Sequence, residues 1–338
     1  MKRIVILTTI VVAGVVATTV AAQLARPRIP PTGAIEKVRD NLYKIGGAGG
    51  NTTVFVRADG VVLVDTKLAN NGQAILDQVK TVTDKPVTMI INTHVHPDHN
   101  GSNDFFKAAR PTIEVVTHEN TRKWVAANPR SNPAMTPDRT FSDRMTLGTG
   151  KDRIDLYYFG AGHTNGDAFV VFPSVRAMDI GDLMAWKMAP LIDPATGGSV
   201  IALPDTLEKA EKGIKNVDLV IEGHGDVNTW KGMHDYTVFN RALLNAAKAS
   251  LAHGGTPEQA VAELEKNPKF AVFLKTELLK DMEYGGTPKS RALINVNVAF
   301  QELKGEKVTT NFGPRPTGPP PGAAAPPPAA PAAPAPGG

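Results

Sequence analysis

The chain contains no cysteine, although it is 338 residues long. Disulfide bonds, thiolate catalysis, cysteine-ligated metal and a lipidated amino-terminal cysteine are therefore all excluded. The absence of cysteine is compatible with an oxidising compartment but does not require one.

A strong charge of either sign is also missing, since the formal net charge is +4. No basic cluster with interleaved aromatic residues occurs, so nucleic acid is not an expected partner. A Gly-x-Ser-x-Gly elbow is absent, which disfavours a covalent serine route, and a phosphate-cradling glycine loop is also absent. The 42% of apolar residues can fill one large α/β domain or two smaller ones.

The first 22 residues predict an export signal. Met1-Lys2-Arg3 gives a charged start, an almost wholly apolar stretch follows, and Val20-x-Ala22 predicts cleavage after Ala22. The alternative is an uncleaved anchor, because the apolar stretch lies just inside the spanning range of about 17 to 25 residues. In both cases the rest of the chain is periplasmic or secreted, and it meets a membrane only through such an anchor.

The remaining chain divides by composition and periodicity. Residues 23–33 are predicted to be a linker and 313–338 a Pro/Ala/Gly-rich disordered tail, with the main α/β domain at 34–230 and helices packed on it at 231–306. Apolar runs and alternation predict strands at 35–38, 42–45, 53–56, 61–64, 87–91, 113–116, 154–159, 168–172, 176–180 and 219–221. Helical spacing is predicted for 70–82, 104–109, 118–127, around 207–214, 239–251, after the capping box at 256–259, and 290–303.

Glycine dominates residues 46–50, between the second and third predicted strands. Glycine by itself explains a flexible hairpin loop at this place. A flap over a binding site is the other reading, and the sequence does not separate the two.

Three imidazoles and a carboxylate stand within six positions, directly after the apolar run 87–91. In α/β sheets, binding and catalytic residues commonly lie at the carboxyl ends of the strands. In an extended segment the side chains of residues i and i+2 point the same way, so His94 and His96 can bind one ion. Pro97 then turns the chain, which frees Asp98 and His99 to reach a second ion. Imidazole with carboxylate is the ligand set that zinc and its neighbours select.

Three further strands end in ligand-type residues beside glycine. His163 follows 154–159, Asp182 follows 176–180, and His224 follows 219–221. Each histidine alone would be an ordinary loop residue, and only the joint pattern indicates a metal site. The other histidines are expected at the surface or in support, with helix capping favoured for His118.

These residues resemble the metallo-β-lactamase superfamily, and the resemblance covers about residues 35–230. The match consists of His94-x-His96-x-Asp98-His99 followed by His163, Asp182 and His224. It implies an α/β fold, a four-layer αββα sandwich with the metals at one edge of two sheets, here extended by C-terminal helices. It also implies a first metal on His94, His96 and His163, a second on Asp98, His99 and His224, and Asp182 as the bridge. Asp65 matches an aspartate that supports the ligand loop.

The bridging residue bears on the substrate. Members of the family that destroy antibiotics usually carry cysteine or serine where this chain has Asp182, whereas glyoxalase II-like hydrolases and lactonases carry aspartate. Cleavage of β-lactams is therefore open. Trp186 reads equally as a pocket wall or as core, and Lys187 is more often a solvated lysine than a partner for a substrate carboxylate.

The predicted function is hydrolysis of a small-molecule ester, thioester, lactone or lactam-like amide. Two Zn²⁺ ions sharing a carboxylate acidify one water, so that hydroxide is available at neutral pH to attack a carbonyl, with Asp98 orienting it. Iron or manganese are alternative metals. The competing functions are a one-iron, persulfide-oxidising oxidoreductase of the same fold and a non-catalytic metal-binding module. The oligomeric state cannot be read from the sequence.

Overall fold

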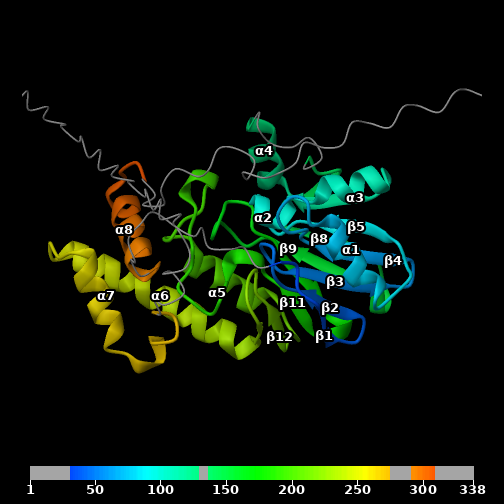
Figure 1. Cartoon of the computed structure of the whole chain (residues 1–338). Helices are drawn as coiled ribbons and strands as arrows, with labels where there is room; N and C mark the ends of the chain where they lie inside the picture. Colours follow the sequence, from blue (N-terminus) through cyan, green and yellow to red (C-terminus); the bar gives the residue numbers. More distant parts are fainter. Residues whose placement is uncertain (1–30, 129–135, 275–290, 309–338) are drawn as a thin grey trace, which may run out of the picture.

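Two β-sheets lie face to face between helices in the computed structural model of the chain (Figure 1). The structure describes residues 31–128, 136–274 and 291–308. The predicted signal at 1–22 and the predicted tail at 313–338 lie outside the described residues, as does most of the predicted linker. The arrangement is the four-layer αββα sandwich that the resemblance implies.

The first sheet has seven strands in chain order. Antiparallel pairing joins the first four and parallel pairing joins the fourth to the seventh. The strands are β1 (Ile35–Arg39), β2 (Leu42–Ile45), β3 (Thr52–Arg57), β4 (Gly60–Val64), β5 (Val87–Ile91), β6 (Glu114–His118) and β7 (Arg139–Phe141). The helices that follow its parallel strands are α1 (Gly72–Lys80), α2 (Pro97–Asn100), α3 (Asn103–Ala109) and α4 (Glu119–Ala127).

The second sheet has six strands in the order β13-β12-β11-β10-β9-β8. Only β11 and β12 pair in parallel, and the long connection between them contains α5 (Leu203–Gly213). The strands are β8 (Arg144–Leu147), β9 (Ile154–Tyr157), β10 (Phe169–Phe172), β11 (Ala177–Asp179), β12 (Leu219–Ile221) and β13 (Val227–Thr229). The C-terminal helices are α6 (Trp230–Ala252), α7 (Pro257–Glu265) and α8 (Arg291–Lys304).

Alternation along the strands explains why the sheets have apolar contacts on both faces. In β4, Val62 and Val64 point into the layer between the sheets, whereas Val61 and Leu63 pack under α1 and α3. In β10, Phe172 faces the inter-sheet layer and Phe169 faces the helices of the second sheet. Each sheet is thus covered on two sides, which a run of consecutive apolar residues allows.

Three strands and one helix were not predicted. β7, β8 and β13 are three or four residues long and stand at sheet edges. Short edge strands carry polar or charged residues, which blunt intermolecular pairing and hide the apolar pattern of a strand. The short helix α2 begins at Pro97, where a turn was expected, and it contains Asp98 and His99. The capping box of Thr256 and Gln259 at the start of α7 is confirmed.

Among the described residues, no helix combines the length and the apolar composition that crossing a membrane requires.

Phe55 of β3 and Phe172 of β10 join the two sheets, with ring centroids 5.0 Å apart and both side chains almost wholly buried. We expect Phe55→Ala to lower the free energy of unfolding by about 3–5 kcal/mol, because it removes a buried ring and leaves a cavity. Urea unfolding followed by circular dichroism measures the change. The control is Val238→Ala on α6, where the side chain is 45% exposed and a change within about 0.5 kcal/mol is expected. Equal stability of the two variants would contradict the packing described.

Candidate metal centre

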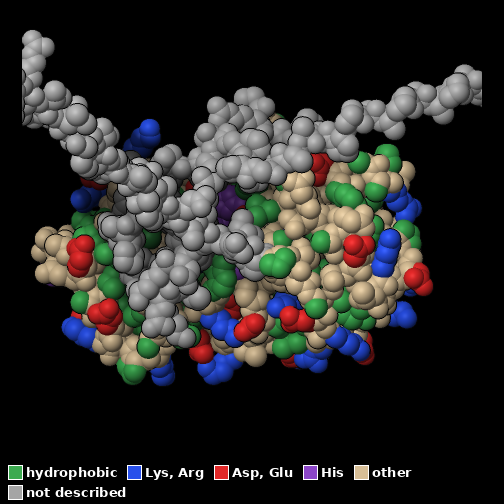
Figure 2. Space-filling view, in the orientation of Figure 1, with side chains coloured by type: hydrophobic (Ala, Val, Ile, Leu, Met, Phe, Trp, Pro, Cys, Tyr) green, Lys and Arg blue, Asp and Glu red, His purple; other side chains and the backbone are tan. Residues whose placement is uncertain are grey.

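The predicted ligands come together at one edge of the sandwich, where strands from both sheets end. His94 and His96 follow β5, and α2 carries Asp98 and His99. From the second sheet come three residues: His163 between β9 and β10, Asp182 in a 3₁₀ turn after β11, and His224 after β12. Figure 2 shows histidine surface near the middle of the face in view. The sequence prediction that all seven side chains meet is matched by the distances between them.

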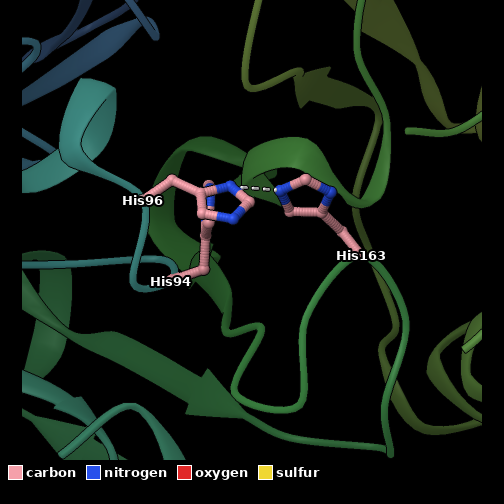
Figure 3. A group of neighbouring side chains, drawn as sticks. All are labelled: His94, His96 and His163. Carbon is pink, nitrogen blue, oxygen red and sulfur yellow. Dashed lines mark hydrogen bonds between the residues drawn. The ribbon is translucent and has the colours of Figure 1, made fainter. Parts of the chain in front are cut away.

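His94, His96 and His163 form the first group, and their rings point toward one another (Figure 3). His163 Nε2 lies 2.8 Å from His96 Nδ1, and the ring of His94 lies 4.8 Å from that of His96 and 4.7 Å from that of His163. Burial lowers the pKa of all three imidazoles, and neighbouring histidines lower the pKa of His94 further. The group therefore presents neutral rings, which is the form that binds a metal.

Asp98, His99 and His224 form the second group. His224 Nε2 lies 3.2 Å from Asp98 Oδ2 and 3.3 Å from His99 Nε2. Burial opposes protonation of both imidazoles, but the carboxylates of Asp182 and Asp98 outweigh it and raise the pKa of His99 and His224. This half of the centre is arranged around positive charge.

Asp182 lies between the two groups. Its Oδ2 is 3.7 Å from His163 Nε2, and its Oδ1 is 3.3 Å from His99 Nε2 and 3.5 Å from His224 Nε2. Burial alone would raise the pKa of this carboxyl, but the imidazoles of His224 and His99 hold it well below its ordinary value. An ionised carboxylate with one oxygen toward each group has the geometry of a bridge.

Two buried polar atoms show that the residues fit metal ions. Among the residues that the structure describes, His94 Nε2 has no hydrogen-bond partner, and Asp182 Oδ1 has only the ion-pair contacts with His99 and His224 given above. A buried acceptor without a partner is unfavourable, and native proteins rarely keep one. Both atoms point into their groups, where a cation would satisfy them. The donor set of imidazoles and carboxylates is the one that Zn²⁺ prefers.

Asp65 supports the ligands, as the resemblance implies. Its carboxylate accepts hydrogen bonds from the Thr93 N–H at 2.8 Å and the Thr93 hydroxyl at 2.6 Å, and it lies 2.6 Å from His99 Nδ1. Asp65 is also close enough to His94 and His99 to form a third ligand group. We assign it the supporting role, because these contacts already use its oxygens and leave His99 Nε2 for a metal.

Asp193 is a supporting residue that the sequence did not predict. Its Oδ2 lies 2.8 Å from His96 Nε2, and its N–H donates to the His163 carbonyl at 2.8 Å. It also accepts hydrogen bonds from Ala195 and Thr196 at the start of a 3₁₀ turn. An Asp-Pro pair in the sequence indicates such a turn but not a histidine partner about a hundred positions away. Asp193 thus fixes the plane of His96 and leaves Nδ1 for the metal.

The glycine-rich segment 46–50 packs directly on the second group. A Cβ added to Gly50 would lie 2.3 Å from a ring carbon of His99, and one added to Gly49 would lie 2.8 Å from the Asp98 carbonyl oxygen. The buried ammonium of Lys67 holds the segment by donating to the Ile45 carbonyl at 2.7 Å and the Gly50 carbonyl at 2.8 Å. Burial lowers the pKa of Lys67 to about 7. Close approach to the ligands is a further reason for glycine here.

The other expectations for this region have mixed outcomes. His118 is confirmed as a cap, because its Nδ1 accepts from the Asn120 N–H at the start of α4. His234 and His253 are exposed, as predicted. Trp186 stacks on His224 with ring centroids 4.1 Å apart, so it is a wall of the centre rather than remote core. For Lys187, the favoured interpretation as a solvated lysine, rather than as a partner for a substrate carboxylate, stays a prediction.

The sequence model of the metallo-beta-lactamase superfamily matches residues 45–184, which include six of the seven candidate ligands, while His224 lies beyond. The chain is 26% identical over 229 residues to a metallo-beta-lactamase type 2 from Elizabethkingia meningoseptica, covering 63% of this chain and 84% of that protein. It is 26% identical over 210 residues to metallo-beta-lactamase IND-1 from Chryseobacterium indologenes, covering 58% and 82%.

Solved structures share the fold. A metallo-beta-lactamase from Pontibacter korlensis superposes with a TM-score of 0.54 at 21% identity, covering 61% of this chain and 98% of that one. The stereoselective inverting sec-alkylsulfatase Pisa1 from Pseudomonas sp. superposes with a TM-score of 0.62 at 17% identity. That alignment covers 80% of this chain but only 50% of the sulfatase.

Gly50 and Gly46 offer a matched pair of substitutions in one loop. We expect Gly50→Ala to displace the His99 ring and to weaken Zn²⁺ binding at the second group by about tenfold or more, as loss of ligand support does. Gly46→Ala should leave binding unchanged, because its added Cβ meets only Asn51 Oδ1 at 3.6 Å. Competition with a chromophoric chelator measures both. Wild-type binding by Gly50→Ala would refute the proposed contact with His99.

Proposed function

We propose that this chain, which belongs to the metallo-β-lactamase superfamily, is a hydrolase that uses two metal ions, with zinc expected, to attack a carbonyl group. The observation that carries the proposal is the carboxylate of Asp182, which faces a ligand group on each side. A single-metal centre would leave one of these buried groups without a function.

The residues present would hold the first ion through His94, His96 and His163 and the second through Asp98, His99 and His224. When bound, such a pair of ions supplies an acidified water as nucleophile and a Lewis acid for the carbonyl oxygen. The protein fixes the ligand rings in advance. His99 is held through Asp65 and His96 through Asp193.

We propose that Asp98 is a catalytic residue in addition to being a ligand of the second ion. Its side chain is 31% exposed, whereas the side chains of the six other candidate ligands are 10% exposed or less. A carboxylate at the open side of the group can accept a hydrogen bond from the attacking water and so direct its lone pair. The histidines around it hold its pKa well below its ordinary value, against the effect of burial, so that it stays an acceptor.

The substrate that we propose is a small molecule with an ester, thioester, lactone or lactam-like amide bond. The two sequence relatives described above are named metallo-beta-lactamases, which supports a lactam as the substrate of this chain. Asp182 at the bridge supports the glyoxalase II-like and lactonase alternatives, as the sequence resemblance implies. The alternative function, an oxidoreductase, would use one iron. The two facing ligand groups favour a two-metal hydrolase over this alternative.

Export is part of the proposal and rests on residues 1–22. We expect the protein recovered from outside the cytoplasm to begin at Gln23, because cleavage is predicted after Ala22. Intact-mass spectrometry of that protein measures the start. Recovery of the full-length chain in the membrane fraction would favour the uncleaved anchor instead, and recovery in the cytoplasm would contradict export.

Metal content and turnover test the function together. We expect two zinc ions per chain after purification without added metal, and hydrolysis of at least one member of a panel of esters, thioesters, lactones and the β-lactam nitrocefin. Asp98→Asn should lower kcat/KM by about 10²-fold or more, the contribution typical of a positioned base. One iron per chain would favour the oxidoreductase. Absence of turnover by the metal-loaded protein would indicate a binding module.

The panel should also contain a secondary alkyl sulfate, because the solved sec-alkylsulfatase aligns with most of this chain. Turnover of the sulfate without turnover of any carbonyl substrate would overturn the proposed substrate class while leaving metal-dependent hydrolysis intact.

A further inference from the structure

Four of the five imidazoles at the centre are fixed by a hydrogen bond at the nitrogen that faces away from their group. These partners are the Thr93 hydroxyl for His94, Asp193 for His96, Asp65 for His99 and the Leu191 carbonyl for His163. Such contacts orient a metal-binding ring and select its tautomer. For His224, no hydrogen bond to Nδ1 exists among the described residues. Some other contact must set the plane of this ring.

That contact is the indole of Trp186. The two rings lie nearly parallel, with an interplanar angle of 20° and centroids 4.1 Å apart. The backbone N–H of Trp186 also donates a hydrogen bond to the backbone carbonyl of His224 at 3.0 Å. The backbone and the ring of His224 are therefore both engaged by one residue, which restricts rotation of the imidazole as a hydrogen bond would.

The turn that presents Trp186 is unusual. Trp186 has φ of 54° and Lys187 has φ of 52°, so two successive non-glycine residues adopt the left-handed conformation. This conformation is unfavourable for side chains of this kind and persists only where surrounding contacts enforce it. The Lys187 N–H donates to Glu222 Oε2 at 2.9 Å, and the Asn228 amide donates to Glu222 Oε1 at 2.8 Å. The strained turn is thus tied to the segment that carries His224.

The C-terminal helix α8 reaches the same place. The guanidinium carbon of Arg291, the first residue of α8, lies 4.7 Å from the centroid of the Trp186 ring, and Arg291 is 2% exposed. An arginine over an indole at this distance is attracted by the ring, more strongly when water is excluded. Arg291 therefore holds the indole in place from a part of the chain beyond the region that the superfamily model matches.

We propose that Trp186, held by Arg291, is a positioning residue for the second ion, because it fixes the imidazole of His224 in the plane that directs Nε2 into the group with Asp98 and His99. The inference rests on the proposed two-ion centre. It also gives the C-terminal helices a function, since they complete the support of a ligand. Trp186 does not contact the first group in this arrangement, and its effect belongs to one ion only.

Stepwise Zn²⁺ binding, measured by competition with a chromophoric chelator, tests the proposal on the full-length protein. His224→Ala identifies which of the two binding steps belongs to the second group. We expect Trp186→Leu to weaken that step by about tenfold or more and to leave the other step unchanged, as loss of a ligand-orienting contact does. Trp186→Phe should restore most of the affinity, because it keeps a stacked ring. Arg291→Met should weaken the same step, and by less than Trp186→Leu.

Trp230→Leu is the matched control, since Trp230 is partly buried against the hydrophobic core beside the second sheet. We expect both of its binding steps to match those of the wild type. Fluorescence gives a second readout, with Trp124 of α4 as its control. Zn²⁺ should change the emission of the wild type and of Trp124→Phe, and the change should be absent in Trp186→Phe.

Three results would overturn the inference. Unchanged binding of both ions by Trp186→Leu would show that the stack positions nothing. Equal weakening of both steps would show a general structural role. A wild-type protein that binds one ion only would overturn the two-ion proposal together with this inference, whereas the first two results would overturn the inference alone.

Discussion

The structure depends on burying five imidazoles and two carboxylates within a few ångströms of one another. Such a cluster is unfavourable by itself, because like rings crowd together and polar atoms such as His94 Nε2 lose water without gaining a partner. The two ligand groups differ in charge. The first group consists of three neutral imidazoles, whereas the second contains two imidazoles and the carboxylate of Asp98. The carboxylate of Asp182 lies between the two groups. A cation in each group would give these buried polar atoms a partner, so bound metal would also stabilise the fold.

The sandwich solves the problem of assembling such a cluster from distant parts of the chain. Each sheet contributes ligands from the ends of buried strands, and the sheets are held face to face by contacts such as that of Phe55 with Phe172. Because the strands are rigid and covered on both faces, the loops after them start from fixed points. The remaining freedom of each ligand ring is removed locally, by Asp65, by Asp193 and by the stacked Trp186.

The sequence predicted most of the fold and the residues that meet at the centre, for identifiable reasons. Buried strands show as apolar runs, and a ligand-type residue directly after such a run, beside glycine, is visible in one dimension. His163, Asp182 and His224 are cases of this kind. The edge strands were missed because exposure leaves no apolar pattern, as the sequence Arg-Met-Thr-Leu of β8 illustrates.

The supporting residues were less readable than the ligands. Asp193 meets His96 from a loop about a hundred residues away, and no local pattern marks such a pairing. Trp186 was recognised as either wall or core, but its left-handed backbone and its stacking on His224 depend on tertiary contacts that the sequence does not display. The glycine-rich segment 46–50 had two open readings, and its packing on His99 became apparent only in three dimensions.

These two classes of residue also differ in what substitution can tell. Removal of a candidate ligand such as His224 would take away a donor atom for the metal and would say little about geometry. Removal of a support such as Asp193 or Trp186 leaves every ligand in the chain and changes only how well one ring is held. The Asp193 carboxylate contacts the ring of His96 and the Trp186 indole stacks on the ring of His224, so these two rings are held independently. If the centre holds two ions as proposed, this arrangement would allow the affinity for one ion to change without loss of the other, and it would tie that affinity to helix α8 through Arg291.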